Sequence, residues 1–522
     1  MKKLTTSIFD FEKLRKEGYL YVDKTDFVWN LVNNPGESYF LSRPRRFGKS
    51  LLVSTLKAIF EGKKELFKGL AIYEKEYDWE KHPVIHLDLN GRDFSTVENM
   101  QTSFKLILKE QAKINGVTLQ DATPDAMFHE LILKLHDNSG DVVILLDEYD
   151  KPILGNISKK NCSDFLAALK PIYSVIKGKS SLLRLAFVTG VSKFCHVSLF
   201  SELNNLTDIT LNPAYAGMLG FTEDEIRSCF AEHIANAVAA NNASCDELMS
   251  RLLEWYDGYR FSRADVHVCN PVSVSSFFNE GYEFNNYWDD TGTPAFLLDL
   301  MRDRSYDFEA ALNGRYDEGI FAAYELDRLD ITGLLWQTGY LTIKELVPGL
   351  RRMKFRLGFP DYEIEDTFMK RLMEYFCGVP KGKGEDTIEE FQKAIAKDDL
   401  DGFMRQFQSF LASIPYGIQL KYEKYYQSVF FIFFRMLGMF ITAESQTSEG
   451  RIDAYVRTEN TIYIFEFKLD KTSDEAIDQI VDRHYYEKFQ SCGLPIRMIG
   501  VNFNSAKGRI DGWKEMALPS RK

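Results

Sequence analysis

The residues with the most direct chemical use form a basic turn, RPRRFGKS at 43–50, which follows a short apolar run. Apolar residues recur after the turn at positions 52, 56, 59 and 60, so the segment predicts a strand, a loop and a helix. Phosphates of a nucleotide are bound by backbone N–H groups at a helix N-terminus, by a lysine ammonium and by a hydroxyl that contacts Mg²⁺. Gly48, Lys49 and Ser50 provide these groups at the required spacing. We therefore expect ATP and Mg²⁺ at this turn, lined by Arg46, Phe47, Gly48, Lys49, Ser50 and Leu51.

The turn departs from the full phosphate-loop pattern at one position. The pattern has a glycine five residues before Gly48, and this chain has Arg43 there. Taken alone, the turn therefore leaves a second interpretation open. In that interpretation the turn is a basic strand-to-helix connection, and Gly48 only eases the bend.

An acidic pair at the end of a later apolar run favours the nucleotide interpretation. Residues 142–146, VVILL, predict a strand buried on both faces of a parallel sheet, and Asp147 and Glu148 follow directly. Ligands of such sheets bind at the carboxyl ends of the strands. We expect Asp147 to hold the Mg²⁺ that Ser50 also contacts, and Glu148 to polarise the attacking water.

Two further stretches have two open interpretations each. The apolar run 183–190 predicts another strand, and Thr189 near its end would contact the γ-phosphate or the attacking water, or would bond to backbone as a structural hydroxyl. Asp257, Tyr259 and Arg260 would reach the nucleotide, or would form a buried turn network around Gly258.

The C-terminal part contains a second set of residues that could do chemistry. Residues 462–468 predict a strand, and Asp453 lies on the other arm of a predicted hairpin. Glu466 and Lys468 point to the same face because side chains alternate along a strand. Hydrolysis of a phosphodiester needs carboxylates for Mg²⁺ and a basic group near the attacking water, and Asp453, Glu466 and Lys468 meet that need. The alternative is a simple ion pair between Glu466 and Lys468.

Composition restricts the class of protein. A chain of 522 residues predicts two to four domains, and a net charge of -12 gives no global attraction to nucleic acid, so such contacts must come from local patches. Residues 411–522 carry +1, which is compatible with DNA contact. The seven cysteines are scattered without metal-ligand spacing. With no signal peptide and no apolar run of about 20 residues, we expect a cytoplasmic protein without a membrane span.

Several stretches resemble the bacterial AAA-ATPase-like family, whose members usually have a PD-(D/E)XK nuclease-like C-terminal domain. They are RPRRFGKS at 43–50, LLDEYDKPIL at 145–154, VTGVSKF at 188–194, LFSELNNLTDITL at 199–211, WYDGYRFS at 255–262, CNPVSV at 269–274 and QTGYLTIKE at 337–345. Because the RPRRFGKS form itself resembles the family's pattern, Arg43 is consistent with it. In the C-terminal domain, the resemblance implies additional polar positions at Glu423 and Gln479.

Together, these observations predict an α/β protein in four parts: an AAA-ATPase-like P-loop domain at 1–220, a helical lid at 221–325, a connector at 326–398 and a restriction-endonuclease-like domain at 399–522. One function hypothesis is an ATPase that controls a metal-dependent nuclease acting on DNA, with RNA as the alternative substrate. The other is a nucleotide-dependent signalling module whose nuclease-like domain docks nucleic acid or protein without cleavage. The resemblance also implies that the chain could assemble as a homo-oligomer.

Overall fold

The structure is a computed structural model, and it describes the whole chain except residues 158, 160, 194–205, 289–294, 305, 323–328, 415–428, 430, 431, 434, 438–444, 448, 449, 453, 459, 505, 508 and 519–522. The chain divides into two compact units. One contains residues 1–291 and 312–365, and the other contains residues 292–311 and 366–522. The predicted division into four parts is finer than this, and it stays a prediction.

The N-terminal unit is built on a five-stranded parallel sheet with the strand order β2-β3-β4-β1-β5. The strands are β1 (Ser38–Ser42), β2 (Val84–Asp88), β3 (Val142–Asp147), β4 (Leu183–Gly190) and β5 (Leu206–Asp208). Strand β4 lies between β1, which precedes the basic turn, and β3, which ends at the acidic pair. In this register Leu41 is paired with Thr189 and Asp88 with Asp147, so the carboxyl ends of the four longer strands meet at one edge.

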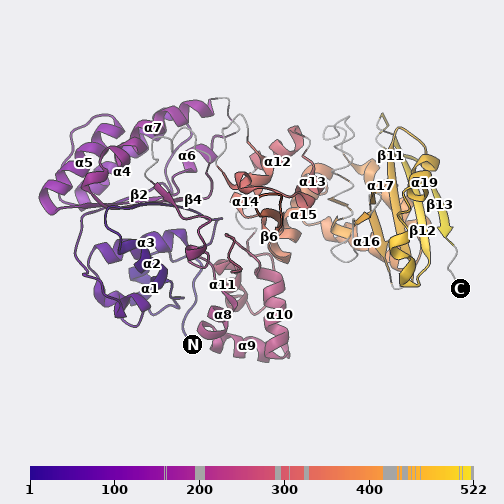
Figure 1. Cartoon of the computed structure of the whole chain (residues 1–522), viewed down its shortest axis with the longest axis horizontal. Coiled ribbons are helices and arrows are strands. Elements are labelled where there is room, and N and C mark those ends of the chain that lie inside the picture. Colours follow the sequence, from indigo (N-terminus) through magenta and orange to yellow (C-terminus); the bar gives the residue numbers. More distant parts are fainter. Residues whose placement is uncertain are drawn as a thin grey trace. The chain divides into compact units, whose positions relative to one another are not determined.

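Helices cover both faces of this sheet, with α1, α2 and α3 on one face and α4, α5 and α7 on the other (Figure 1). Helices α3, α4 and α5 contact the strands directly, through apolar side chains that recur with the period of a helix. In α4, for example, Phe104, Ile107 and Leu108 are buried, and the Thr96 hydroxyl caps the helix start. The helices are α1 (Phe11–Lys16), α2 (Thr25–Val32), α3 (Lys49–Phe60), α4 (Val97–Ile114), α5 (Pro124–Ser139), α6 (Lys151–Leu154) and α7 (Cys162–Gly178).

The rest of this unit is mainly helical and ends in a β-hairpin. The sequence TEDE at 222–225 has the pattern of a capping box, which predicts a helix start. The first helix of this region begins there, and Thr222 and Glu225 form a reciprocal capping box. The elements are α8 (Glu223–Cys229), α9 (Ala231–Asn241), α10 (Cys245–Tyr256), α11 (Pro271–Asn279), α14 (Ile331–Thr338), β6 (Thr342–Val347) and β7 (Lys354–Gly358). Short 3-10 helices span Lys64–Phe67, Ala71–Glu74, Ser180–Leu182, Pro213–Tyr215 and Glu318–Phe321.

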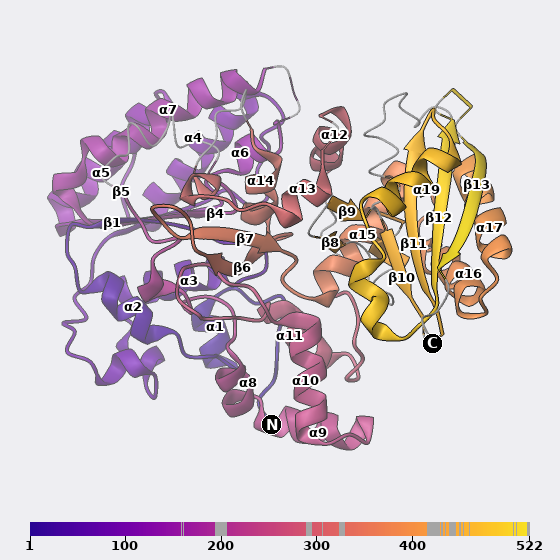
Figure 2. The ribbon, with the colours of Figure 1, turned by 45° about the vertical axis from the view of Figure 1, so that its right-hand side comes forward.

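The second unit contains a four-stranded mixed sheet in the order β10-β11-β12-β13. Strands β11 and β12 are parallel, and the two outer pairs are antiparallel. Helix α19 lies across β11 and β12 (Figure 2), where Ile477 and Ile480 pack on Ile464 and Met498. The strands are β8 (Ser445–Thr447), β9 (Gly450–Ile452), β10 (Ala454–Arg457), β11 (Ile462–Leu469), β12 (Ile496–Asn504) and β13 (Arg509–Leu518). The helices are α12 (Ala295–Asp303), α13 (Phe308–Asn313), α15 (Tyr362–Cys377), α16 (Gly384–Ala396), α17 (Leu400–Ser413), α19 (Ser473–Asp482) and the 3-10 helix Glu487–Cys492; α13 and α15 cross the boundary between the units.

The predicted α/β fold class is confirmed. The sequence of residues 18–25, GYLYVDKT, also predicts a strand by its alternation, and that prediction is wrong. The alternating segment 18–25 makes only an isolated bridge between Lys3 and Tyr19. Val22 in this segment packs into the apolar cluster of helices α8 to α11, so the segment buries its side chains without a neighbouring strand. The described residues contain no helix long and apolar enough to cross a membrane.

Candidate nucleotide and nuclease sites

The basic turn connects β1 to α3 through two residues in the left-handed region. Gly48 precedes the first residue of α3 with φ 91°, and Arg46 has φ 66°. Glycine adopts this conformation without the penalty that a Cβ atom brings. Among the described residues no side chain caps α3, which suits a helix whose first N–H groups bind an anion.

Arg43, at the position of the missing glycine, has a structural role. Its side chain is 1% exposed, and its Nη1 donates to the carbonyls of Ser42 and Thr210 at 2.9 Å each. Its guanidinium lies 4.3 Å from the ring centroid of Phe261. Burial lowers the pKa of Arg43 to about 9. Arg43 therefore joins the turn to residues that lie far away in the sequence.

Lys49 lies within the curve of the turn. Its Nζ donates to the carbonyls of Arg43 and Pro44 at 2.9 and 2.8 Å. Burial lowers the pKa of Lys49, while the carboxylates of Asp147 and Glu148 act in the opposite direction. The ammonium is thus held at the turn and faces the acidic end of β3.

Asp147 ends β3 and is 2% exposed. Burial raises its pKa to about 6, against a hydrogen bond from Ser50 and the attraction of Lys49. A carboxylate that loses hydration in this way gains from a divalent cation, and hydroxyl and carboxylate oxygens are ligands that Mg²⁺ prefers. Ser50 and Asp147 therefore fit the predicted magnesium site.

Glu148 lies beside Asp147 at the edge of the sheet. Its backbone has φ 53°, and its N–H donates to Asp147 Oδ1 at 3.0 Å. Its carboxylate is half-buried and pairs with Lys151 Nζ at 3.0 Å. The left-handed backbone turns the chain directly after Asp147.

Thr189 is fully buried, and its hydroxyl donates to the carbonyl of Leu41 at 2.7 Å. This bond is the one that the structural interpretation of Thr189 requires, and contact with the γ-phosphate or the attacking water stays a prediction. A residue that sequence reasoning missed, Asp150, fixes the loop after β4. It accepts hydrogen bonds from the Val191 N–H and from the N–H and hydroxyl of Ser192 at 2.6–3.1 Å. The signal was the third acid of the sequence DEYD at 147–150, which begins at the end of the strand.

The segment 255–262 packs against the turn from the helical side. Phe47 is 1% exposed, and its ring lies edge-on to Tyr259 and Phe261, at 4.7 and 5.3 Å between centroids. The Tyr259 hydroxyl donates to the carbonyl of Gly339 at 3.1 Å. Arg260 donates to backbone carbonyls of the same turn. The contacts of Tyr259 and Arg260 are those of the buried turn network.

An apolar cavity of about 120 Å³ adjoins the start of α3. Its walls come from the N-terminal segment, the turn and the helical region. They include Ile8, Val22, Gly48, Leu51, Met218 and Val272.

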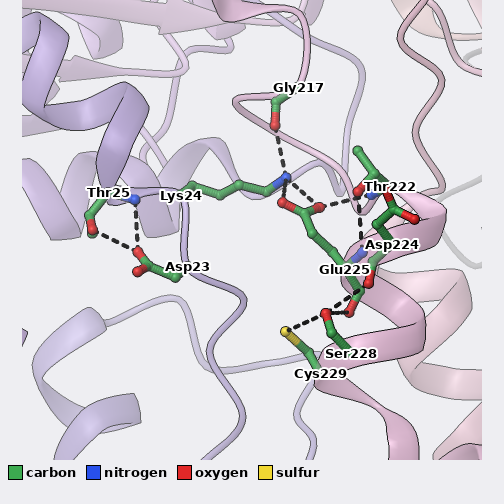
Figure 3. A network of polar contacts seen from close by, with 9 residues as sticks. All are labelled: Asp23, Lys24, Thr25, Gly217, Thr222, Asp224, Glu225, Ser228 and Cys229. Atoms are coloured by element: carbon green, nitrogen blue, oxygen red, sulfur yellow. Dashed lines mark hydrogen bonds and ion pairs between the residues drawn. The ribbon is translucent and has the colours of Figure 1, made fainter. Parts of the chain in front are cut away.

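Lys24, which also lines the cavity, makes polar contacts with Gly217 and Glu225 (Figure 3). Its Nζ bonds to the carbonyl of Gly217 at 2.8 Å and to both carboxylate oxygens of Glu225 at 2.6 Å. Glu225 is also the capping-box residue of α8. This ion pair therefore connects the segment before α2 to the helical region.

In the second unit, the structure brings together three of the five predicted C-terminal residues. Lys468 Nζ bonds to Glu466 Oε1 at 3.0 Å and also to Gln479 Oε1. Gln479 in turn donates to the Tyr485 hydroxyl at 3.4 Å. Glu466 lies on the inner strand β11 and is 1% exposed, so its carboxylate is buried.

The other two predicted residues, Asp453 and Glu423, lie outside the described residues. Strand β10 begins at Ala454 and pairs antiparallel with β11, as the predicted hairpin requires. Within the described part of the chain, no group of three His, Cys, Asp or Glu residues is placed to hold a metal ion.

Comparison with known proteins agrees with this geometry. The family model described as a predicted AAA-ATPase matches residues 5–200, and a model of the PD-(D/E)XK nuclease superfamily matches residues 421–513. A protein of Azotobacter chroococcum mcd 1, described as an uncharacterized protein in the vnfD 5' region, is 34% identical over 523 residues, with 98% of each chain covered. The chain belongs to the AAA-ATPase-like family. Its C-terminal domain belongs to the PD-(D/E)XK nuclease superfamily.

One solved structure shows a weaker likeness to this AAA-ATPase-like protein. It is a signal transduction ATPase with numerous domains and a tetratricopeptide repeat sensor from Pyrococcus horikoshii. That protein is 11% identical, and the match covers 79% of this chain and 56% of the other, with a TM-score of 0.22. A likeness of this size carries no argument about function.

Proposed function

We propose that the N-terminal unit binds ATP with Mg²⁺ and hydrolyses it. The observation that carries this proposal is the approach of Lys49 and Ser50, at the start of α3, to Asp147, at the end of β3. These groups come from two parts of the sequence, and the parallel sheet brings them to one edge.

Each residue has a defined task in this proposal. The first N–H groups of α3 and the Lys49 ammonium bind the outer phosphates, where the ammonium exchanges the carbonyls of Arg43 and Pro44 for phosphate oxygens. Ser50 and Asp147 hold Mg²⁺, which neutralises the charge that develops on the phosphates. Glu148 orients the attacking water and accepts its proton. The cavity beside Gly48 and Leu51 takes the base, because its walls are mainly apolar.

Glu148 gives the test of hydrolysis. Glu148→Gln keeps the shape of the side chain but removes the base, so we expect nucleotide binding to persist and phosphate release to fall by 10²-fold or more. Lys151→Ala is the matched control, since it removes the ion-pair partner of Glu148 and should leave turnover within a fewfold of wild type. Normal phosphate release by Glu148→Gln would refute the assigned role.

We propose that the C-terminal domain is a Mg²⁺-dependent nuclease that acts on DNA. The supporting observation is that Lys468 of β11 bonds to Glu466 on the same strand and to Gln479 of α19. In this proposal Asp453 and Glu466 hold the metal, Lys468 orients or deprotonates the water, and Glu423 and Gln479 are additional polar groups. The metal would supply a low-pKa water and neutralise the scissile phosphate.

The alternative is that this domain docks nucleic acid or protein without cleavage. One observation favours this alternative. The Lys468 ammonium already donates hydrogen bonds to Glu466 and Gln479 within the fold, which is a structural role that needs no metal or water. Location in the cytoplasm and assembly into a homo-oligomer are further proposals that accompany either function.

Cleavage of linear duplex DNA by the full chain, with Mg²⁺ or Mn²⁺ and with or without ATP, separates the two possibilities. We expect Lys468→Ala to bind metal and lose cleavage, while Lys471→Ala, on the exposed turn after β11, should cleave normally. Asp453→Ala should lose both metal binding and cleavage. Retention of DNA without metal binding or cleavage by the wild type would favour the docking alternative.

A further inference from the structure

The tip of the β6–β7 hairpin exposes apolar and basic side chains next to one another. The two antiparallel strands lie side by side (Figure 2) and are joined by residues 348–353, PGLRRM. Leu350 at the tip is 100% exposed, and Met353 is 40% exposed. Arg351 and Arg352 lie between them and are exposed as well. The tip therefore offers apolar and cationic groups together.

Contacts along the hairpin hold this tip in one shape. Gly349 lies so close to the Arg352 carbonyl that a Cβ atom would be 2.3 Å from that oxygen, which only glycine permits. Arg356 pairs with Glu345 across the strands at 2.9 Å. Phe355 forms a two-way backbone bridge with Tyr316 at 2.7–2.8 Å. A fixed tip loses little conformational entropy on binding.

The hairpin also concentrates positive charge on an acidic protein. Residues 344–356 contain five Lys or Arg and one Glu, whereas the whole chain carries -12. Two of the five are engaged within the fold, because Arg356 pairs with Glu345 and Lys344 donates to the Pro360 carbonyl. No ion pair is observed for Arg351, Arg352 or Lys354 among the described residues. Cationic side chains without an acidic partner in the fold are available to bind the phosphates of a nucleic acid.

We propose that this hairpin tip is a binding site for duplex DNA. A two-stranded β-ribbon fits the major groove, and arginines bind phosphates as bidentate donors. In that groove the apolar Leu350, placed beside two arginines, would contact base edges such as the methyl group of thymine. An anionic lipid surface is the competing partner, and the test includes it.

The inference goes beyond the proposed nuclease, because it places a DNA contact in the N-terminal unit, outside the C-terminal domain. It does not require cleavage. Tip binding would persist if the C-terminal domain proved inactive, and cleavage by that domain could occur without the tip.

Binding of the full-length protein to a fluorescent duplex of 30 base pairs tests the proposal, measured by anisotropy in EDTA at several salt concentrations. Arg351→Ala/Arg352→Ala should weaken binding by about tenfold or more and reduce the slope of log K against log[salt] by about 0.9 for each lost phosphate contact. Lys68→Ala/Lys113→Ala is the matched control, since it also removes two exposed cations and should leave the slope unchanged.

A second variant separates the apolar contribution from the charge. Leu350→Ser should weaken duplex binding severalfold with an unchanged salt slope, and its complete exposure predicts normal folding. The proposal is overturned if the double arginine variant keeps both the wild-type affinity and the wild-type slope. It is also overturned if the variants alter binding to vesicles of anionic phospholipid but not to duplex DNA. If the wild-type protein does not cleave DNA but binds the duplex through the hairpin tip, only the nuclease proposal is refuted.

Discussion

Replacement of Asp147 by Asn should stabilise the metal-free protein while it removes the magnesium site. Burial raises the pKa of this carboxyl from 3.8 to about 6. The folded state therefore binds more protons than the unfolded chain between these values, and the free energy of unfolding decreases as pH rises from about 4 to about 6. One pKa unit corresponds to about 1.4 kcal/mol, so ionised Asp147 costs roughly 3 kcal/mol above pH 6.

The isosteric Asp147→Asn variant has no such titration. We expect the variant and the wild type to have similar stability near pH 4, and the variant to be more stable by up to about 3 kcal/mol near pH 8. Mg²⁺ with ATP should reverse the order at pH 8, because only the wild type gains stability from the bound ligand.

The stability difference is measured by unfolding in urea, with hydrogen exchange of the β3 amides as the readout. This readout reports on the N-terminal unit alone. Asp88→Asn is the matched control, since Asp88 ends the neighbouring strand and is exposed. Equal stability of wild type and Asp147→Asn at pH 8 without metal would refute the assigned burial cost. An Asp147→Asn protein that Mg²⁺ and ATP stabilise as much as wild type would refute its role as a metal ligand.

Two other substitutions test how the turn is supported. Arg43→Gly restores the glycine of the phosphate-loop pattern, yet it should lower the free energy of unfolding by about 3 kcal/mol in chemical denaturation, because it removes buried hydrogen bonds to Ser42 and Thr210. Arg45 is exposed, so Arg45→Ala is the control and should leave the stability unchanged. Unchanged stability of Arg43→Gly would contradict the role of Arg43. Gly258→Ala should lower the melting temperature by several degrees, since its Cβ would lie 2.2 Å from the Pro360 carbonyl and φ is +122°. Gly281→Ala also has positive φ but has open space, and it should cost only about 1 kcal/mol; equal losses at the two glycines would contradict the close approach.

The sequence predicted the elements whose signal is local. Short-range patterns predict three such features, and the structure contains them. They are the buried strand that ends at Asp147, the turn ending in Gly48-Lys49-Ser50 and the capping box at Thr222. The pairing of Lys468 with Glu466 likewise follows from alternation along one strand.

The remaining features depend on contacts between distant residues. The role of Arg43 needs Thr210 and Phe261, which no pattern around the turn can show. The sequence pattern at 18–25 predicted a strand, but a strand also needs a neighbouring backbone, and Val22 packs on helices instead. The bond from Thr189 to Leu41 is similarly set by the register of two strands.

Calorimetric titration of the full chain with ATP and Mg²⁺ tests the nucleotide site most directly, with Lys49→Ala compared to wild type. Lys49 provides the main positive charge at the turn, and Lys57→Ala, which removes a more exposed lysine from the same helix, is the control. We predict that wild type and Lys57→Ala bind with equal affinity and that Lys49→Ala shows no binding heat. Wild-type affinity in the Lys49→Ala protein would contradict the assignment of this turn as the phosphate-binding loop.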